Sequence, residues 1–289
     1  MKRYLGGKAS LTAAACIIGD EVLNGKTRDS NSHYLANWCF RHGVDLRRVE
    51  VIPDDAADIG ESVRRLASRF DLVYTSGGIG PTHDDITYEA IANAYGLPLA
   101  YHAETLCRMR ERITPTTAAS MDEDVVRNRE RMALLPVGDA VHIHYAANAN
   151  LWTPVVIIGH QVHILPGVPA LFERLLESLP LPAKTRGGQD VAAADAFHRV
   201  LIGTPRTESH IAEALRAEQA RVCGQVKIGS YPRWHSEVRL GQARVVVALV
   251  GRDKHALDMC AQRLLPLVDG VLLGDPSKED ARAEGSSHS

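Results

Sequence analysis

The stretch from residue 75 to residue 85 holds the residues of this sequence whose types and spacing could do chemistry. It contains three glycines: Gly77, Gly78 and Gly80. Without side chains, they leave backbone N–H groups open to a phosphate, and the helical pattern that begins behind them adds unpaired N–H donors. Asp84 and Asp85 follow, and paired carboxylates beside an anion need a divalent cation between them. The stretch predicts a metal-assisted phosphate site, with a Gly-Pro turn followed by a solvated acidic helix start as the alternative.

Two further acidic pairs follow apolar runs earlier in the chain. Asp20 and Glu21 come directly after the first run, and Asp54 and Asp55 follow the second. If these runs are parallel strands, their carboxyl ends meet at one edge of a sheet, beside the glycine stretch. Carboxylates there are natural metal ligands or water-orienting groups, and several close together need a counter-cation. A helix cap or a solvated acid is the alternative for each pair taken alone.

Strands and helices alternate through the first part of the chain and would position these residues. We expect three buried strands, at residues 11–19, 44–52 and 71–75. We expect three helices after them, at residues 29–42, 54–69 and 86–95. This alternation predicts an α/β fold, a doubly wound and mainly parallel sheet with helices on both faces. Such sheets bind ligands at the carboxyl ends of their strands, where the glycines and acids fall.

A second, smaller domain is predicted after a linker. Before it, we expect residues 100–135 to be helical, with strands at 140–145, 155–158 and 162–165 and a helix at 170–179. After it, strands at 197–202, 225–230, 237–250 and 270–273 and helices at 207–221 and 254–267 give the order βαββαβ. That order is typical of a ferredoxin-like α+β domain. The predicted boundaries are 11–180 for the first domain, 181–195 for the linker, 196–275 for the second domain and 276–289 for a disordered tail.

The composition is that of an ordinary soluble globular protein, with 45% hydrophobic and 24% charged residues. A net charge of −2 gives no electrostatic support for binding nucleic acid or an anionic membrane. No apolar run reaches the length of a membrane span. The five cysteines are scattered without a CxxC motif, which favours a reducing compartment and a cytoplasmic location. The basic start, residues 1–8, makes a short organelle-targeting segment the alternative.

Several other motifs are weak or excluded. The run from Gly19 to Thr27 resembles a phosphate-binding P-loop, but five residues separate its glycines where that motif has four. No GxGxxG follows the first strand, so a Rossmann dehydrogenase has no support. His142 and His144 share a strand face and could bind a metal, but without a third ligand they are better interpreted as ordinary strand residues. No nucleophile elbow is present, and no cysteine has an obvious catalytic partner.

Three stretches together resemble the molybdopterin-binding domain family, which includes the MogA and MoaB cofactor-biosynthesis proteins, CinA and the N-terminal domain of eukaryotic FAD synthases. They are residues 19–25 with 29–31, residues 75–87, and residues 165–169. The resemblance covers about residues 12–180. It extends more weakly to 207–212 and 228–232, which look like the small domain that follows in CinA and the FAD-synthase branch. Residues 151–156 look closer to the eukaryotic branch than to CinA.

The resemblance implies a sheet-edge site for a phosphorylated pterin or an adenine dinucleotide. Asp54 and Asp85 match catalytic aspartates, and Asp20, Asp84 and Asp85 would hold a divalent metal, Mg²⁺ or Co²⁺, with K⁺ as an additional ion. The residues expected to contact the substrate or its phosphate are Asn31, Gly77, Gly78, Gly80, Pro81, Thr82 and Gly167. We expect a homo-oligomer, a dimer or trimer, and no nucleic-acid or membrane partner. The small domain lacks the GXXG loop with which KH domains bind RNA.

For function, the resemblance implies metal-dependent hydrolysis of a dinucleotide pyrophosphate, either FAD to FMN and AMP or ADP-ribose to AMP and ribose phosphate. A molybdopterin adenylyltransferase is one alternative, because its nucleophile attacks the same kind of phosphorus centre. A catalytically silent pterin- or nucleotide-binding protein is another. Because the chain ends at Ser289, we expect neither the C-terminal FAD-synthesising domain nor the deamidase domain of these relatives.

Overall fold

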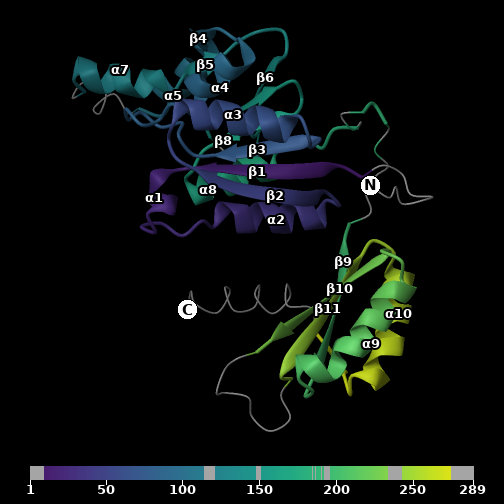
Figure 1. The fold of residues 1–289 in the computed structure, drawn as a ribbon. Helices are drawn as coiled ribbons and strands as arrows, with labels where there is room; N and C mark the ends of the chain where they lie inside the picture. The colour runs from purple at the N-terminus through teal and green to yellow at the C-terminus, as the bar shows by residue number, and fades with distance from the viewer. Residues whose placement is uncertain are drawn as a thin grey trace. The chain divides into compact units, whose positions relative to one another are not determined.

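The computed structural model divides the chain into two compact units, Met1–Ala194 and Asp195–Ser289 (Figure 1). It describes residues 10–113, 121–147, 151–183, 185, 187–189, 191, 196–233 and 243–274. The basic start, the tail predicted at 276–289 and part of the predicted linker lie outside these residues. Within the described part of the chain, none of the helices has the length and apolar character needed to cross a membrane.

The larger unit is built on a six-stranded sheet in the order β2-β1-β3-β8-β7-β6. Its strands are β1 (Thr12–Ile18), β2 (Asp45–Ile52), β3 (Leu72–Ser76), β6 (Val141–His144), β7 (Val155–Ile158) and β8 (Val162–Leu165). β2, β1, β3 and β8 run parallel, whereas the pairs of β7 with β8 and with β6 are antiparallel. The mainly parallel sheet confirms the predicted α/β fold.

Helices cover both faces of this sheet (Figure 1). α2 (Asn31–Arg41) and α8 (Pro169–Glu177) pack on one face, and α3 (Ala56–Ala67) and α4 (Thr87–Tyr95) pack on the other. The residues of β1 divide between the two cores: Ala13, Ala15 and Ile17 lie in the first, and Ala14, Cys16 and Ile18 in the second. A strand buried on both faces must be apolar at every position, which is why the sequence shows an unbroken apolar run.

Two segments differ from the prediction. Residues 100–135 were expected to be helical, but short strands β4 (Leu99–Tyr101) and β5 (Leu134–Pro136) lie at the two ends and pair antiparallel. Helices α5 (Ala103–Arg110) and α7 (Glu123–Arg131) lie between them. The prediction is wrong at both ends because the pairing joins residues far apart in the chain, which local periodicity does not reveal. The short helix α1 (Asp20–Leu23), directly after β1, was also not predicted.

The smaller unit has its own antiparallel sheet and core. Its elements are β9 (His198–Thr204), α9 (Glu208–Arg221), β10 (Val226–Pro232), β11 (Val245–Gly251), α10 (Lys254–Leu267) and β12 (Val271–Leu273). The strand order is β10-β11-β9-β12, and every neighbouring pair is antiparallel. Both helices lie on one face of this sheet, with Ile202, Ile211 and Leu257 in the core between them (Figure 1). This arrangement confirms the predicted ferredoxin-like α+β fold. The first residues of the strand predicted at 237–250 lie outside the described part.

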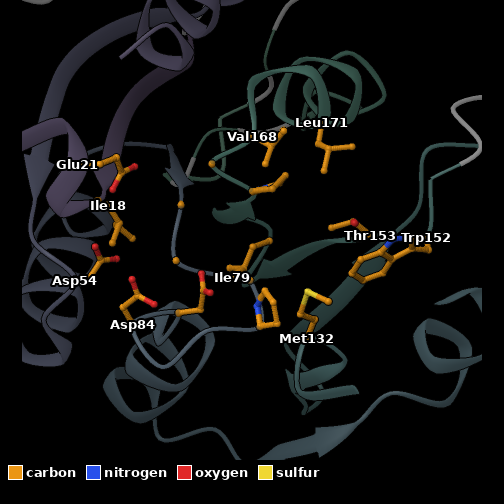
Figure 2. Close-up of a pocket in the computed structure, with 18 residues that line it drawn as sticks. Ile18, Glu21, Asp54, Ile79, Asp84, Met132, Trp152, Thr153, Val168 and Leu171 are labelled. Carbon is orange, nitrogen blue, oxygen red and sulfur yellow. The ribbon is translucent and has the colours of Figure 1, made fainter. Parts of the chain in front are cut away.

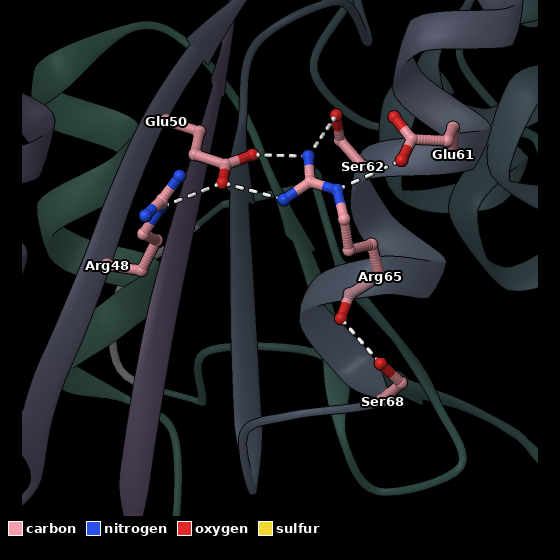
Figure 3. Close-up of polar contacts among 6 residues, drawn as sticks. All are labelled: Arg48, Glu50, Glu61, Ser62, Arg65 and Ser68. Carbon is pink, nitrogen blue, oxygen red and sulfur yellow. Dashed lines mark hydrogen bonds and ion pairs between the residues drawn. The ribbon is translucent and has the colours of Figure 1, made fainter.

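An ion-pair network holds α3 against the edge strand β2 (Figure 3). Glu50 of β2 accepts hydrogen bonds from both Nη atoms of Arg65 at 2.8 Å and from Nε of Arg48 at 2.9 Å. These hydrogen bonds, that of Arg65 above all, lower the pKa of Glu50. At the start of α3, the Asp55 carboxylate caps the helix by accepting from the N–H groups of Ala57 and Asp58. The network therefore fixes the segment that carries Asp54, the residue before the cap.

Candidate functional site

A cavity of about 480 Å³ lies at the carboxyl edge of the large sheet. The ends of β1 and β3 and the loops after β2 and β8 supply its walls, as the topology predicted. Eight of the predicted site residues line it: Asp54, Gly77, Gly78, Gly80, Pro81, Asp84, Asp85 and Gly167. Asp20, Asn31 and Thr82 are predicted site residues that do not line it. The structure therefore gathers most of the predicted site around one cavity.

The glycine loop passes so close to β1 and to the start of α4 that it excludes side chains at two positions. Gly77 has φ +112°, and a Cβ placed on it would lie 2.0 Å from the carbonyl oxygen of Ile18. Gly78 has φ +65°, and a Cβ there would lie 2.2 Å from Oγ1 of Thr87. The Thr87 hydroxyl donates to the carbonyl of Gly77 at 3.0 Å, which ties the loop to the start of α4. Glycine is thus required at positions 77 and 78 by the path of the chain itself.

Asn31 joins the two loops that form the floor of the cavity. Its Nδ2 donates to Oγ of Ser76 at 2.8 Å and to the carbonyl oxygen of Gly167 at 2.8 Å. The Ser76 hydroxyl donates in turn to the carbonyl oxygen of Pro166 at 3.3 Å. Asn31 is only 6% exposed and sits behind the wall of the cavity. In the structure it fixes the loop after β8 against the end of β3.

Three carboxylates gather at one end of the cavity: Glu21, Asp54 and Asp84 (Figure 2). The backbone N–H of Asp20 donates to Oδ2 of Asp54 at 3.0 Å. Burial raises the pKa of Asp54, and the negative charges of Asp20, Glu21 and Asp84 raise it further, against the effect of that hydrogen bond. This end of the cavity is therefore strongly acidic, and an anion can approach it only with a cation.

Asp85 has a different environment from these three acids. Its Oδ2 accepts hydrogen bonds from the backbone N–H and the hydroxyl of Thr82, at 2.8 and 2.5 Å. Arg131, the last residue of α7, donates through Nη2 to the carbonyl oxygen of Asp85 at 3.0 Å and through Nη1 to that of Thr82. Asp85, Thr82 and Arg131 thus hold the shape of the loop that presents Asp84.

The carboxylates that line the cavity determine which kind of cation the cavity could bind. Among the residues that the structure describes, no group of three or more His, Cys, Asp or Glu side chains is arranged to hold a metal ion. Mg²⁺ in phosphate sites is usually held by one or two carboxylates, with waters and substrate phosphate oxygens as the other ligands. Asp84, whose carboxylate lines the cavity beside the glycine loop, could hold a cation that binds together with the substrate.

The structure gives His142 and His144 separate partners. His142 contacts His160, with the Nε2 atoms 3.1 Å apart, and His144 contacts Oγ of Ser178 at 3.0 Å. Each of the two strand histidines therefore has its own partner. They do not converge on a shared position, as expected for ordinary strand residues.

Comparison with known proteins identifies the family. Residues 14–185 match the family model described as a probable molybdopterin binding domain. The chain belongs to the molybdopterin-binding domain family. Residues 196–273 match a second model, described as the middle domain of FAD synthase. The first match confirms the resemblance drawn from residues 19–25 with 29–31, 75–87 and 165–169, and the second confirms the weaker one at 207–212 and 228–232.

Individual relatives cover different shares of the chain. A probable FAD synthase of Caenorhabditis elegans is 37% identical over 179 residues, which are 58% of this chain and 34% of that protein. A CinA-like protein of Myxococcus xanthus is 36% identical over 208 residues, 68% of this chain and 46% of that protein. The crystal structure of CinA from Thermoplasma acidophilum matches with a TM-score of 0.50 and 30% identity, over 58% of this chain and 95% of that chain. The chain spans less than half the length of the first two relatives.

Sequence reasoning missed part of this site. Glu21 was noted beside Asp20, yet it is Glu21 that lines the cavity, because successive residues of α1 point in different directions. The other missed lining residues are Ile18, Gly19, Ile79, Met132, Trp152, Thr153, Pro166, Val168 and Leu171. Trp152 had one signal, its place in a stretch that looked specific to one branch of the family. Met132 had none, because it follows α7 and reaches the cavity only through the tertiary fold.

Proposed function

We propose that this chain hydrolyses the pyrophosphate bond of a dinucleotide with the help of a divalent metal, with FAD to FMN and AMP as the first substrate to test and ADP-ribose to AMP and ribose phosphate as the second. The observation that carries the proposal is the set of three carboxylates facing a glycine loop in one cavity. The relationship to proteins named probable FAD synthase supports the choice of FAD. The bond broken is a phosphorus–oxygen bond of the bridge, and water supplies the oxygen that replaces it.

The residues can be given separate roles in this reaction. Backbone N–H groups of the loop from Gly77 to Gly80 bind phosphate oxygens, because no side chain covers them. Asp54 accepts the proton of the attacking water, since burial raises its pKa and makes it a stronger base than a solvated aspartate. Mg²⁺ or Co²⁺, held by Asp84 together with water and substrate oxygens, would neutralise the charge that develops on the phosphate. The sequence predicted Asp85 as a catalytic residue and metal ligand; because Thr82 donates two hydrogen bonds to its Oδ2, the role proposed for Asp85 is instead to position the loop.

The first experiment is an assay of AMP release. The purified protein is incubated with FAD, ADP-ribose or NADH, each with Co²⁺, Mg²⁺ or EDTA, and AMP is measured by chromatography. We expect AMP that depends on the metal and disappears with EDTA. The absence of AMP from all three substrates would refute the proposal.

A variant pair tests the role of Asp54. Asp54→Asn should lower turnover by about 100-fold or more, the usual contribution of a general base. Asp58→Asn is the matched control, because Asp58 is an exposed residue of α3 that does not line the cavity. Equal turnover in the two variants would exclude Asp54 as the base.

Molybdopterin adenylyl transfer is the second candidate, supported by the family match of residues 14–185. The same acids and glycines would serve, with the terminal phosphate of molybdopterin as the nucleophile in place of water. Incubation with molybdopterin, ATP and Mg²⁺ would then give an adenylylated product. A chain that binds these ligands without turnover would be a silent binding protein.

We also propose self-association to a dimer or trimer, a small-molecule nucleotide or pterin as the binding partner, and the cytoplasm as the location. Size-exclusion chromatography with light scattering measures the assembly. A monomer at micromolar concentration would refute the oligomer.

A further inference from the structure

The cavity is divided into two chemically different ends. Glu21, Asp54 and Asp84 stand at one end, whereas the other end is lined by apolar side chains (Figure 2). These side chains are Met132, Trp152, Val168 and Leu171. A volume of about 480 Å³ is far more than a phosphate group and its metal fill, and lies within the range of pockets for small organic ligands. The cavity therefore has room for a second, apolar part of the ligand.

The apolar end offers surface that the fold itself leaves uncovered. Val168 is 57% exposed although it lies between two elements of the core, β8 and α8. Trp152 and Met132 are only partly buried. Each of these side chains lines the cavity, so part of its exposed surface faces the ligand space. Partly covered indole and thioether groups are well suited to contact the face or edge of an aromatic ring.

Trp152 and Met132 each lie near a part of the fold that is held by strand pairing or by hydrogen bonds. Trp152 precedes β7, which is buried at three of its four positions and pairs with both β6 and β8. Met132 follows Arg131, which is bound to the loop of Thr82 and Asp85 at the acidic side of the cavity. The two ends of the cavity are thus built on one framework, and a ligand with a ring and a phosphate can contact both.

We infer that Trp152 and Met132 form a binding subsite for a planar heteroaromatic ring of the ligand, joined by a spacer to the phosphates held at the glycine loop. The inference rests on the proposed function for the identity of the phosphate end. The ring is a flavin or an adenine, which share a flat π-system that stacks on an indole. Discrimination between dinucleotides then depends on which ring this subsite accepts.

The test measures binding rather than turnover. Isothermal titration calorimetry is carried out with FMN, AMP and inorganic pyrophosphate on the wild-type chain, Trp152→Ala and Trp152→Phe. Loss of one base–aromatic stack weakens affinity by about 5- to 150-fold. We expect that loss for FMN or AMP in Trp152→Ala, near-wild-type affinity in Trp152→Phe, and unchanged pyrophosphate affinity in both. Met132→Ala should weaken the same ring-bearing ligand.

The titration results test the proposed ring subsite independently of the hydrolase proposal. Loss for FMN identifies a flavin subsite and loss for AMP an adenine subsite. Wild-type affinity of Trp152→Ala for both ligands, or weakening of pyrophosphate to the same extent, overturns the inference. So does a wild-type chain that binds neither FMN nor AMP. Failure of the proposed function shows separately, as absence of AMP release from a chain that still binds these ligands.

Discussion

Replacement of Gly77 by alanine tests whether the path of the glycine loop is fixed by β1. At φ +112° an L-residue is strained, which costs about 1–3 kcal/mol. The new Cβ would also lie 2.0 Å from the carbonyl oxygen of Ile18, so the strand end or the loop must move by more than an ångström. Relief of such a clash costs a further 1–3 kcal/mol or so, the usual range for overpacking. The expected loss of unfolding free energy is therefore about 2–6 kcal/mol.

Gly96→Ala separates strain from the clash. Gly96 has φ +64° at the end of α4, and a Cβ there would meet nothing within 4 Å. We expect a loss of about 1–2 kcal/mol, from backbone strain alone. Thermal unfolding followed by circular dichroism should show a Tm reduction of about 2–4 °C for each kcal/mol in both variants.

The activity of the two variants gives the second readout. Displacement of the loop by an ångström should lower AMP release by about 100-fold in Gly77→Ala. Gly96→Ala should retain wild-type turnover below its Tm. Equal Tm losses in the two variants, or full activity of Gly77→Ala, would show that β1 does not fix the path of the loop.

Three further predictions concern other parts of the molecule. Arg131→Gln removes both hydrogen bonds to the loop of Asp85 and should lower kcat by about tenfold or more with little change in Tm; equal activity would show that Arg131 does not position the loop. The side chain of Glu218 is 4% exposed and accepts hydrogen bonds from Nε and Nη2 of Arg263. Glu218→Gln should therefore lower the free energy of unfolding, measured in urea, by about 2–3 kcal/mol. Glu213→Gln, which removes the charge of an exposed pair with Arg216, should lower it by less than about 1 kcal/mol. Burial lowers the pKa of His163 from 6.5 to about 4. As the pH falls, the unfolded chain binds a proton at this histidine before the folded chain does, so the free energy of unfolding is highest above pH 6.5 and should be about 2 kcal/mol lower at pH 5. His163→Phe should remove this part of the pH dependence of unfolding.

The acidic and glycine-rich half of the site could be predicted from the sequence because it depends on a simple rule of topology. Asp54 and Asp84 follow strands that run parallel, so the fold must bring them to one edge. The position of Asn31 behind the wall could not be predicted, because a residue at a helix start can face a ligand or a neighbouring loop. Its two hydrogen bonds, to Ser76 and Gly167, show that it faces the neighbouring loops.

The apolar half of the site could not be predicted for a physical reason. Met132 and Trp152 have no periodicity or motif that relates them to the glycine loop. They arrive at the cavity through the pairing of β4 with β5 and of β7 with β8, and long-range pairing leaves no local pattern in the sequence. The fold of the smaller unit was easier to predict from the sequence, because its six elements each show a clear pattern and follow one another in a common order.

The hydrogen bonds of Asn31 to Ser76 and Gly167 have a consequence for the synthesis of the chain. They span 45 and 136 residues, and β8 joins the sheet beside β3 although it lies far along the chain. The cavity cannot close on a ribosome until the residues of β8 and the following loop have emerged. Such long-range closure slows folding, and a ligand that binds the cavity stabilises only the completed unit. Ligand binding by a nascent or truncated chain would therefore report that this unit has finished folding.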